Sequence, residues 1–286
     1  MNASPPKSAS IACDPSPQRN VVPALEVEFA QQLNLANARD LLLNLVKAEL
    51  TARYKTPVLG MLWFLLSPLV MTAILITVFQ SVIRLPIERY PVFLVAALLP
   101  WTFFQVGVSN ATVAVTRSQA LVKRVRIPRL LLPLSAVIAS LVHFVISLAI
   151  MLLVLLAMGQ RPPSLALLAL PLLIVIQLFI VCGIGMATAA LNVVYRDVEH
   201  IVAMVVRFSF WLTPIFYSLD HVPERWRGFF SLNPVTPLLE GYRAVLVHGQ
   251  VPDAGVLVRV AAMGVALLVL GAIVFTRIDP QLDDYV

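Results

Sequence analysis

The longest apolar stretch of the sequence constrains the fold more than any other feature. Residues 130–194 carry a single formal charge, Arg161. A soluble domain of this length needs charged residues around its core, whereas helices that face lipid do not. Over the whole chain 59% of the residues are hydrophobic and only 13% are charged. We therefore expect an all-α integral membrane protein.

The thickness of a bilayer sets how many crossings the chain can make. Hydrocarbon about 30 Å thick needs about 20 apolar residues of helix, at about 1.5 Å per residue. Six stretches reach or approach this length, and the fifth is marginal because it is short and contains Arg207. The predicted transmembrane helices are residues 59–82, 91–115, 130–158, 165–194, 201–218 and 256–276.

The distribution of lysine and arginine predicts the orientation. Basic residues are more numerous beside the termini and in the loops 116–129 and 195–200 than in the opposite loops, which include Arg243. Lysine and arginine near membrane spans are retained in the cytoplasm. We therefore expect both termini and these two loops on the cytoplasmic side. The net charge of +6 reflects this placement and does not indicate a nucleic-acid partner.

The segment between the fifth and sixth spans, residues 219–255, is too polar for two more crossings and too apolar for a free loop. Two short re-entrant helices are predicted there. One opens at Pro223, and the other has Thr236 as its N-cap, Pro237 as its first residue and Gly249 just past its end. Each is shorter than the bilayer is thick.

Residues 37–56 are predicted to form an amphipathic helix on the cytoplasmic surface. Polar side chains recur at spacings of three and four residues, which places them on one stripe, while leucine and valine occupy most of the remaining surface. The stripe consists of Asp40, Asn44, Lys47, Thr51 and Lys55. Two interpretations are open for this helix: a simple membrane anchor, or a docking surface for another subunit.

Two cytoplasmic loops also have two interpretations each. The basic loop 121–129, which ends at Pro128-Arg129, serves either orientation in the membrane or docking of a partner. Tyr195-Arg196-Asp197 follows the fourth span and is either an ordinary turn or a contact with a partner protein.

Aromatic residues are concentrated in the fifth predicted span and just after it. Aromatic rings stack on the apolar faces of sugars, but they also gather at bilayer boundaries regardless of ligand. Pro68 and Pro214 lie within the first and fifth predicted spans and favour kinks there. These two spans are the candidates for the wall of a conduit. Its candidate ring contacts are Phe208, Trp211, Phe216, Tyr217, Trp226 and Phe230.

Polar groups suited to catalysis or ion coupling are not found in the predicted spans. His143 and Gln177 are expected to form hydrogen bonds between helices. The sequence has no phosphate-binding G-x-x-x-x-G-K-[ST] motif, no paired motif suited to a metal and no acidic residue in a span. A membrane enzyme such as a glycosyltransferase, or an ion-coupled carrier, is therefore disfavoured. We expect a transport permease that is not itself an enzyme.

Several short motifs together resemble a known family, the permease subunits of ATP-binding-cassette exporters of polysaccharides. This type-2 group handles O-antigen, capsule and teichoic-acid chains. The resemblance covers residues 37–280, although Pro57 and the start of the basic loop depart from the pattern. It rests on Arg39-Asp40-Leu41-Leu42, Arg53-Tyr54-Lys55, Leu59-Gly60, Trp63, Pro68, residues 123–129, Tyr195-Arg196-Asp197, Pro214-Ile215-Phe216-Tyr217, Asn233-Pro234 and Gly241-Tyr242-Arg243.

The resemblance implies a homodimer in the bacterial cytoplasmic (inner) membrane that works with two ATPase subunits. ATP and Mg²⁺ would be bound by those partners, so no cofactor is expected on this chain. Residues 1–36, rich in proline, serine and alanine over 1–23, are expected to form a disordered cytoplasmic tail. The resemblance implies an interface helix over 37–56 and outer gate helices at 223–248 within a six-span permease domain over 57–286. The implied coupling residues are Arg39, Asp40, Arg53, Tyr54, Lys123, Arg126, Tyr195, Arg196 and Asp197.

The implied activity is export of a lipid-linked polysaccharide, an O-antigen or a related glycan, across the cytoplasmic membrane. The alternative is a permease of the same architecture that exports a drug or another small hydrophobic molecule.

Overall fold

The computed structural model describes residues 35–54, 70–82, 87, 89–119, 127–157, 164–219 and 222–279. Within these ranges every regular element is helical. Three parts of the sequence prediction lie outside the described residues. They are residues 1–34 of the predicted tail, residues 59–69 of the first span with Pro68, and the part of the basic loop that contains Lys123 and Arg126. The chain divides into two compact units, Met1–Leu41 and Leu42–Val286. Helix α2, Leu35–Tyr54, begins in the first unit and corresponds to the predicted interface helix.

Four helices in the described part of the chain are long and apolar enough to cross a bilayer. They confirm the second, third, fourth and sixth predicted spans, with ends that differ by only a few residues. These helices are α4 (Tyr90–Arg117), α6 (Leu131–Ala157), α8 (Ala169–Val194), which follows the single turn α7 (Ser164–Leu167), and α12 (Ala254–Ile278).

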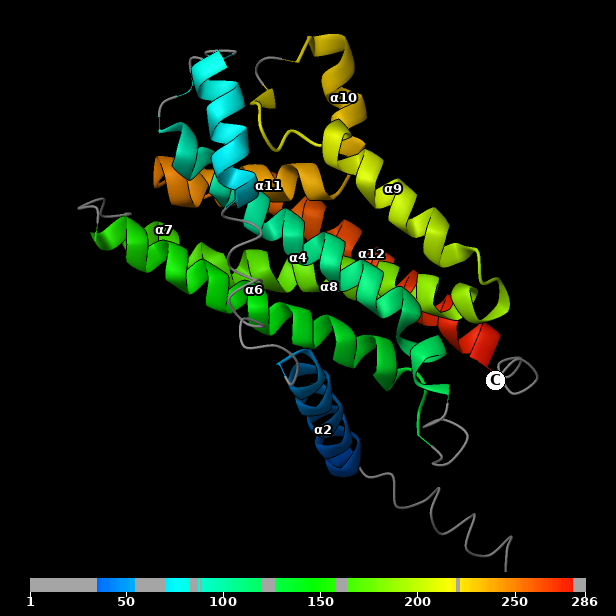
Figure 1. Ribbon diagram of the computed structural model, residues 1–286. Coiled ribbons are helices and arrows are strands. Elements are labelled where there is room, and N and C mark those ends of the chain that lie inside the picture. The colour runs from blue at the N-terminus through cyan, green and yellow to red at the C-terminus, as the bar shows by residue number, and fades with distance from the viewer. Residues whose placement is uncertain are drawn as a thin grey trace, which may run out of the picture. The chain divides into compact units, whose positions relative to one another are not determined.

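Helix α8 lies at the centre of the second unit and packs against α4, α6 and α12, as Figure 1 shows. Helices α8 and α12 cross at two glycines, Gly183 and Gly271. A Cβ atom added to Gly271 would overlap the backbone of Gly183, and one added to Gly183 would overlap the backbone at Leu267. The small residues of α8 therefore allow backbone contact between the two helices, as small residues commonly do in membranes.

The fifth predicted span differs from the prediction at its end. Helix α9, Val198–Leu212, has 15 residues and stops before Pro214. The residue before a proline is driven into extended backbone, and Thr213 has φ −95° and ψ 137°. The prediction of a helix that continues to Ser218 with a kink at Pro214 is therefore wrong, because this proline ends the helix. The described part of the first span is a short apolar helix, Val70–Gln80, whose last turns widen into the π-helix η1, Thr77–Val82.

Two short helices occupy the segment after α9, as predicted. Helix α10, Glu224–Leu232, follows Pro223, which confirms its predicted start. Helix α11, Val235–Arg243, continues into the π-helix η3, Ala244–His248, and ends at Gly249 with φ 65°.

The predicted N-cap of the second short helix is wrong. The N-cap of α11 is Pro234, and Thr236 is a buried residue of its first turn. The side chain that serves this end is Asn233, whose Oδ1 accepts a hydrogen bond from the Val235 amide at 3.0 Å. An Asx turn therefore fixes the helix start.

Candidate functional site

Aromatic rings around the C-terminal end of α9 form a continuous series, here called the aromatic cluster. Phe216 is at its centre, with its ring centroid 4.7 Å from that of Phe79, 5.5 Å from Trp211 and 5.0 Å from Tyr217. These spacings lie within the range of favourable aromatic pairs. The further members are Phe230, 6.5 Å from Tyr217, Phe229 beside Phe230, and Phe210 and Trp101, 5.9 Å apart.

The structure brings together four of the six rings predicted as ring contacts. Trp211, Phe216, Tyr217 and Phe230 belong to the aromatic cluster. Phe216 is buried, whereas Trp211 is 56% exposed. The other two rings are also exposed: Phe208 on α9, and Trp226 on α10, where Arg225 lies 5.7 Å from its centroid.

Four members of the cluster were not among the six predicted ring contacts: Phe79, Trp101, Phe210 and Phe229. Phe79 and Trp101 join the cluster from the helix over residues 70–80 and from α4. Phe210 and Phe229 belong to the same aromatic run as the predicted rings. The positions of Phe79 and Trp101 depend on packing between distant segments, for which the sequence carries no local signal.

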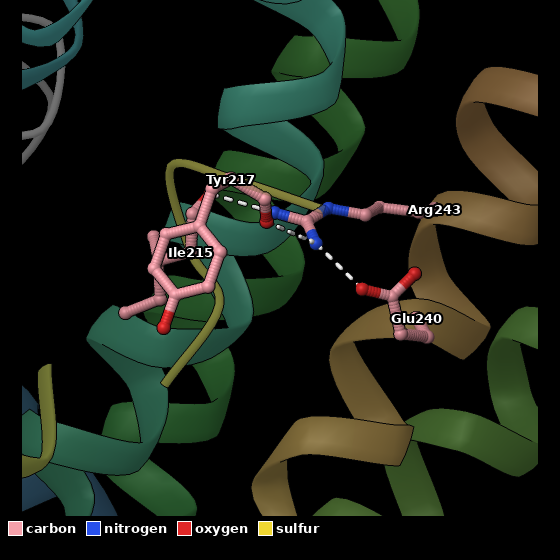
Figure 2. A network of polar contacts seen from close by, with 4 residues as sticks. All are labelled: Ile215, Tyr217, Glu240 and Arg243. Atoms are coloured by element: carbon pink, nitrogen blue, oxygen red, sulfur yellow. Dashed lines mark hydrogen bonds and ion pairs between the residues drawn. The ribbon is translucent and has the colours of Figure 1, made fainter. Parts of the chain in front are cut away.

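Three successive carbonyl oxygens beside the cluster accept hydrogen bonds from two buried side chains. Arg243 donates through Nη2 to Ile215 O at 2.6 Å and through Nη1 to Tyr217 O at 3.4 Å. The Tyr90 hydroxyl donates to Phe216 O at 3.1 Å. Figure 2 shows the guanidinium of Arg243 between the 215–217 segment and Glu240. Residues 215–217 are thus attached to both α4 and α11.

Arg243 is a buried charge with favourable neighbours on three sides, and only its Nε has no hydrogen-bond partner among the described residues. It is 1% exposed, and its Nη1 donates to Glu240 Oε1 at 2.7 Å. Its guanidinium carbon lies 3.7 Å from the centroid of the Phe93 ring, a cation–π contact. Burial lowers the pKa of Arg243, and the Glu240 carboxylate acts in the opposite direction. The sequence prediction placed Arg243 only by its side of the membrane, and the enclosure of its side chain by protein is a feature that the count of basic residues does not reveal.

A second buried contact joins α11 to the two central helices. The Tyr242 hydroxyl donates to Gln177 Oε1 at 2.9 Å, and Gln177 Nε2 donates to Pro100 O at 2.7 Å. The predicted role of Gln177 as a hydrogen-bond link between helices is confirmed. For His143, Nδ1 lies 2.7 Å from Ala139 O of its own helix.

The turn between α8 and α9 contains three of the predicted coupling residues. Tyr195, Arg196 and Asp197 are all exposed there. The turn is held by buried Asn192, whose Oδ1 accepts from the Glu199 amide at 3.0 Å and whose Nδ2 lies 3.5 Å from Thr116 Oγ1.

A polar cavity of about 250 Å³ adjoins this turn. Its lining residues are Thr116, Gln119, Asn192, Arg196 and Glu199.

Of the other predicted coupling residues, Arg39 and Asp40 are exposed on α2. The side chains of Arg53 and Tyr54 lie outside the described residues, as do Lys123 and Arg126.

Metal ligands do not gather anywhere in the described ranges. No group of three or more His, Cys, Asp or Glu side chains there could hold a metal ion.

Comparison with known proteins identifies the family. Residues 40–247 match the family described as ABC-2 type transporter. The chain is 35% identical over 239 residues to the O-antigen export system permease protein RfbA of Myxococcus xanthus, covering 83% of this chain and 92% of that protein. It is 29% identical over 223 residues to a protein of the same name from Klebsiella pneumoniae, with coverage of 78% and 86%. It is also 24% identical over 243 residues to the Polysialic acid transport protein KpsM of Escherichia coli, with coverage of 82% and 92%.

The chain belongs to the ABC-2 type transporter family. It is therefore a multi-pass membrane protein, the permease component that works together with an ATP-binding subunit.

Proposed function

We propose that this chain is the transmembrane subunit of an ATP-driven exporter that moves a lipid-linked polysaccharide, an O-antigen or a related glycan, across the bacterial cytoplasmic membrane. The observation that carries the proposal is similarity over most of the chain to three proteins named for O-antigen export or polysialic acid transport. The cargo named for these relatives is a sugar polymer in each case.

In the proposed assembly two copies of the chain bind two ATP-binding-cassette ATPase subunits, which hold ATP and Mg²⁺. Each copy contributes six spans, with α9 and the helix over residues 70–80 belonging to the fifth and first. Both termini lie in the cytoplasm, α2 lies on the cytoplasmic surface, and α10, α11 and η3 form the outer gate.

An apolar stripe on α9 supports the homodimer. These side chains recur at spacings of three and four residues, each is exposed in the single chain, and of this helix only Val206 is buried. A membrane helix that presents such a face next to a break in its backbone gains contacts from a second copy across a two-fold axis. The stripe consists of Ile201, Met204, Val205, Phe208, Trp211 and Leu212.

The aromatic cluster supports a glycan as the cargo. Rings offer apolar, hydrogen-bond-free surface on which successive sugars stack weakly, which suits a polymer that has to slide. In the proposed path the exposed rings Phe208, Trp211 and Trp226 meet the glycan, and buried Phe216 supports them.

The turn at Tyr195-Arg196-Asp197 and the polar face of α2 support coupling to the ATPase. Exposed charged side chains beside a polar cavity offer hydrogen-bonding partners to another protein. Nucleotide-driven closure of the two ATPases is proposed to push on these segments and open the path.

Replacing Trp211 by alanine tests the proposed cargo. We expect export of surface polysaccharide to fall about fivefold, because losing the stacking contact between this ring and a sugar costs on the order of 1 kcal/mol. Surface polysaccharide is measured by immunoblot in cells that lack the native gene, with protein abundance measured in parallel. Trp211→Phe keeps a ring and is the matched control, expected to retain most of the export.

The same cells separate the alternative cargo. Unchanged surface polysaccharide together with altered tolerance to drugs would contradict glycan export and support an exporter of small hydrophobic molecules.

A further inference from the structure

The end of α9 at Leu212 creates a local problem of hydrogen bonding. Residues 215–217 lie in bends outside any helix, so their carbonyl oxygens have no regular helical donor. Ile215 is fully buried and Phe216 nearly so. A buried carbonyl oxygen without a hydrogen-bond donor destabilises the folded protein, so this segment needs side-chain donors in order to pack here.

Arg243 and Tyr90 supply these donors from two different helices. The Arg243 guanidinium has a planar fork of N–H groups that can reach Ile215 O and Tyr217 O together while a third bond goes to Glu240. Tyr90 donates to Phe216 O between them. A lysine could not satisfy the same set, because its ammonium is a compact point charge.

The charge itself argues for a specific role. Burying an arginine is expensive even when it is paired, and an apolar side chain of similar volume often packs at least as well. What an apolar side chain cannot do is bind the backbone of another segment at defined positions. The buried guanidinium therefore fixes one position of residues 215–217, and this role accounts for a charge whose burial costs free energy.

We propose that Arg243 is a positioning residue for transport. It holds residues 215–217 between α4 and α11, so that the rings of Phe216 and Tyr217 keep their places in the aromatic cluster; this rests on the proposed function of that cluster as the glycan contact. Arg243 is the last residue of α11, directly before η3. Movement of α11 therefore moves the guanidinium, the 215–217 segment and the rings together.

The helix over residues 70–80 also contacts the 215–217 segment. Phe79 stacks on Phe216 with a centroid distance of 4.7 Å and an interplanar angle of 25°. A displacement of Phe216 would therefore move the described part of the first span as well as α9 and α11. The buried guanidinium, together with the Tyr90 hydroxyl, therefore sets the relative positions of the segments that surround the cluster.

Accessibility of a cysteine at position 215 tests the proposal. The reporter Ile215→Cys is placed in a chain in which Cys13→Ser and Cys182→Ala remove the native thiols, and membranes are labelled with a maleimide reagent. The expected result is slow labelling with Arg243 present and labelling about tenfold faster with Arg243→Met, because two backbone hydrogen bonds to a charged group are lost. Arg243→Lys is expected to restore part of the protection and part of the polysaccharide export. The matched control is Arg259→Met, which removes an exposed arginine of α12 and is expected to change neither readout.

A milder variant keeps the test decisive if Arg243→Met is not recovered in the membrane. Tyr90→Phe removes only the bond to Phe216 O and is expected to speed labelling a few-fold, with a matching fall in export. Labelling of both variants at the rate of the Arg259→Met control would overturn the proposal. Faster labelling with normal export would also overturn it, because the segment would then be released without effect on transport.

The two readouts give a different result if the proposed function, rather than the role of Arg243, is wrong. If the cargo is not a polysaccharide, export fails to depend on this chain even with Arg243 present, while the labelling difference between Arg243→Met and its control remains.

Discussion

At the scale of single residues, the most informative side chains are polar ones buried between helices. Arg243 and Gln177 are each 1% exposed, and each binds backbone carbonyls of a segment distant in sequence. From the sequence alone, an arginine near a span reads as an orientation signal, because the positive-inside rule applies to basic residues in loops. Only the three-dimensional packing shows that Arg243 faces protein.

Tyr242→Phe is predicted to destabilise the chain by about 1–2 kcal/mol, because it removes the donor to Gln177 Oε1 and leaves that oxygen buried. The measurement is thermal unfolding of the purified protein in detergent. In the double variant Tyr242→Phe with Gln177→Met, the loss is expected to be smaller than the sum of the single losses. Strict additivity would show that the two side chains do not interact.

At the scale of elements, the sequence predicts those helices whose signals are local. Helices α4, α6, α8 and α12 were predictable because each is a long apolar run of bilayer length. The start of α10 depends on Pro223, which the sequence shows directly. The start of α11 depends on the Asn233 side chain and was missed, because Thr236-Pro237 presents an equally good capping pattern. The aromatic segment of the candidate site was visible as a cluster of rings. Its attachment through Arg243 and Tyr90 was not, because those bonds join residues 26 to 126 positions apart.

The crossing of α8 and α12 leads to a prediction about these two elements. Gly271→Ala is expected to lower the free energy of unfolding by about 1–3 kcal/mol or more, because the new methyl group would overlap the Gly183 backbone and push the helices apart. Protein abundance and monodispersity in size-exclusion chromatography report the effect. The matched control is Gly228→Ala in α10, where an added Cβ would meet no side chain and no other segment within 4 Å and alanine favours the helix. Equal behaviour of the two variants would contradict the close crossing.

At the scale of the whole molecule, the proposed path through the membrane takes its energy from another protein. The exposed turn at Tyr195-Asp197 and the aromatic cluster belong to different segments, and α4, α8 and α9 join them through packing and the Asn192 contacts. Coupling then requires that the ATPase and the path respond to each other, since coupling between sites is reciprocal.

Replacing Tyr195 by alanine and Asp197 by asparagine together is predicted to reduce the ATPase activity of the partner subunit in the complex, by roughly tenfold for loss of about 1–2 kcal/mol of interface contacts. Steady-state ATP hydrolysis by the purified complex is the measurement, with assembly checked by co-purification. Gln250→Ala, an exposed residue outside the proposed coupling segments, is the control and is expected to leave turnover unchanged. Full ATPase activity in the complex with the double variant would show that the turn is not part of the coupling surface.

The most direct test reconstitutes the chain in liposomes with and without its ATP-binding partner and follows movement of a lipid-linked glycan across the bilayer. We expect translocation only when both subunits and hydrolysable ATP are present. ATP-driven translocation by this chain alone would show that the energy does not come from a partner subunit.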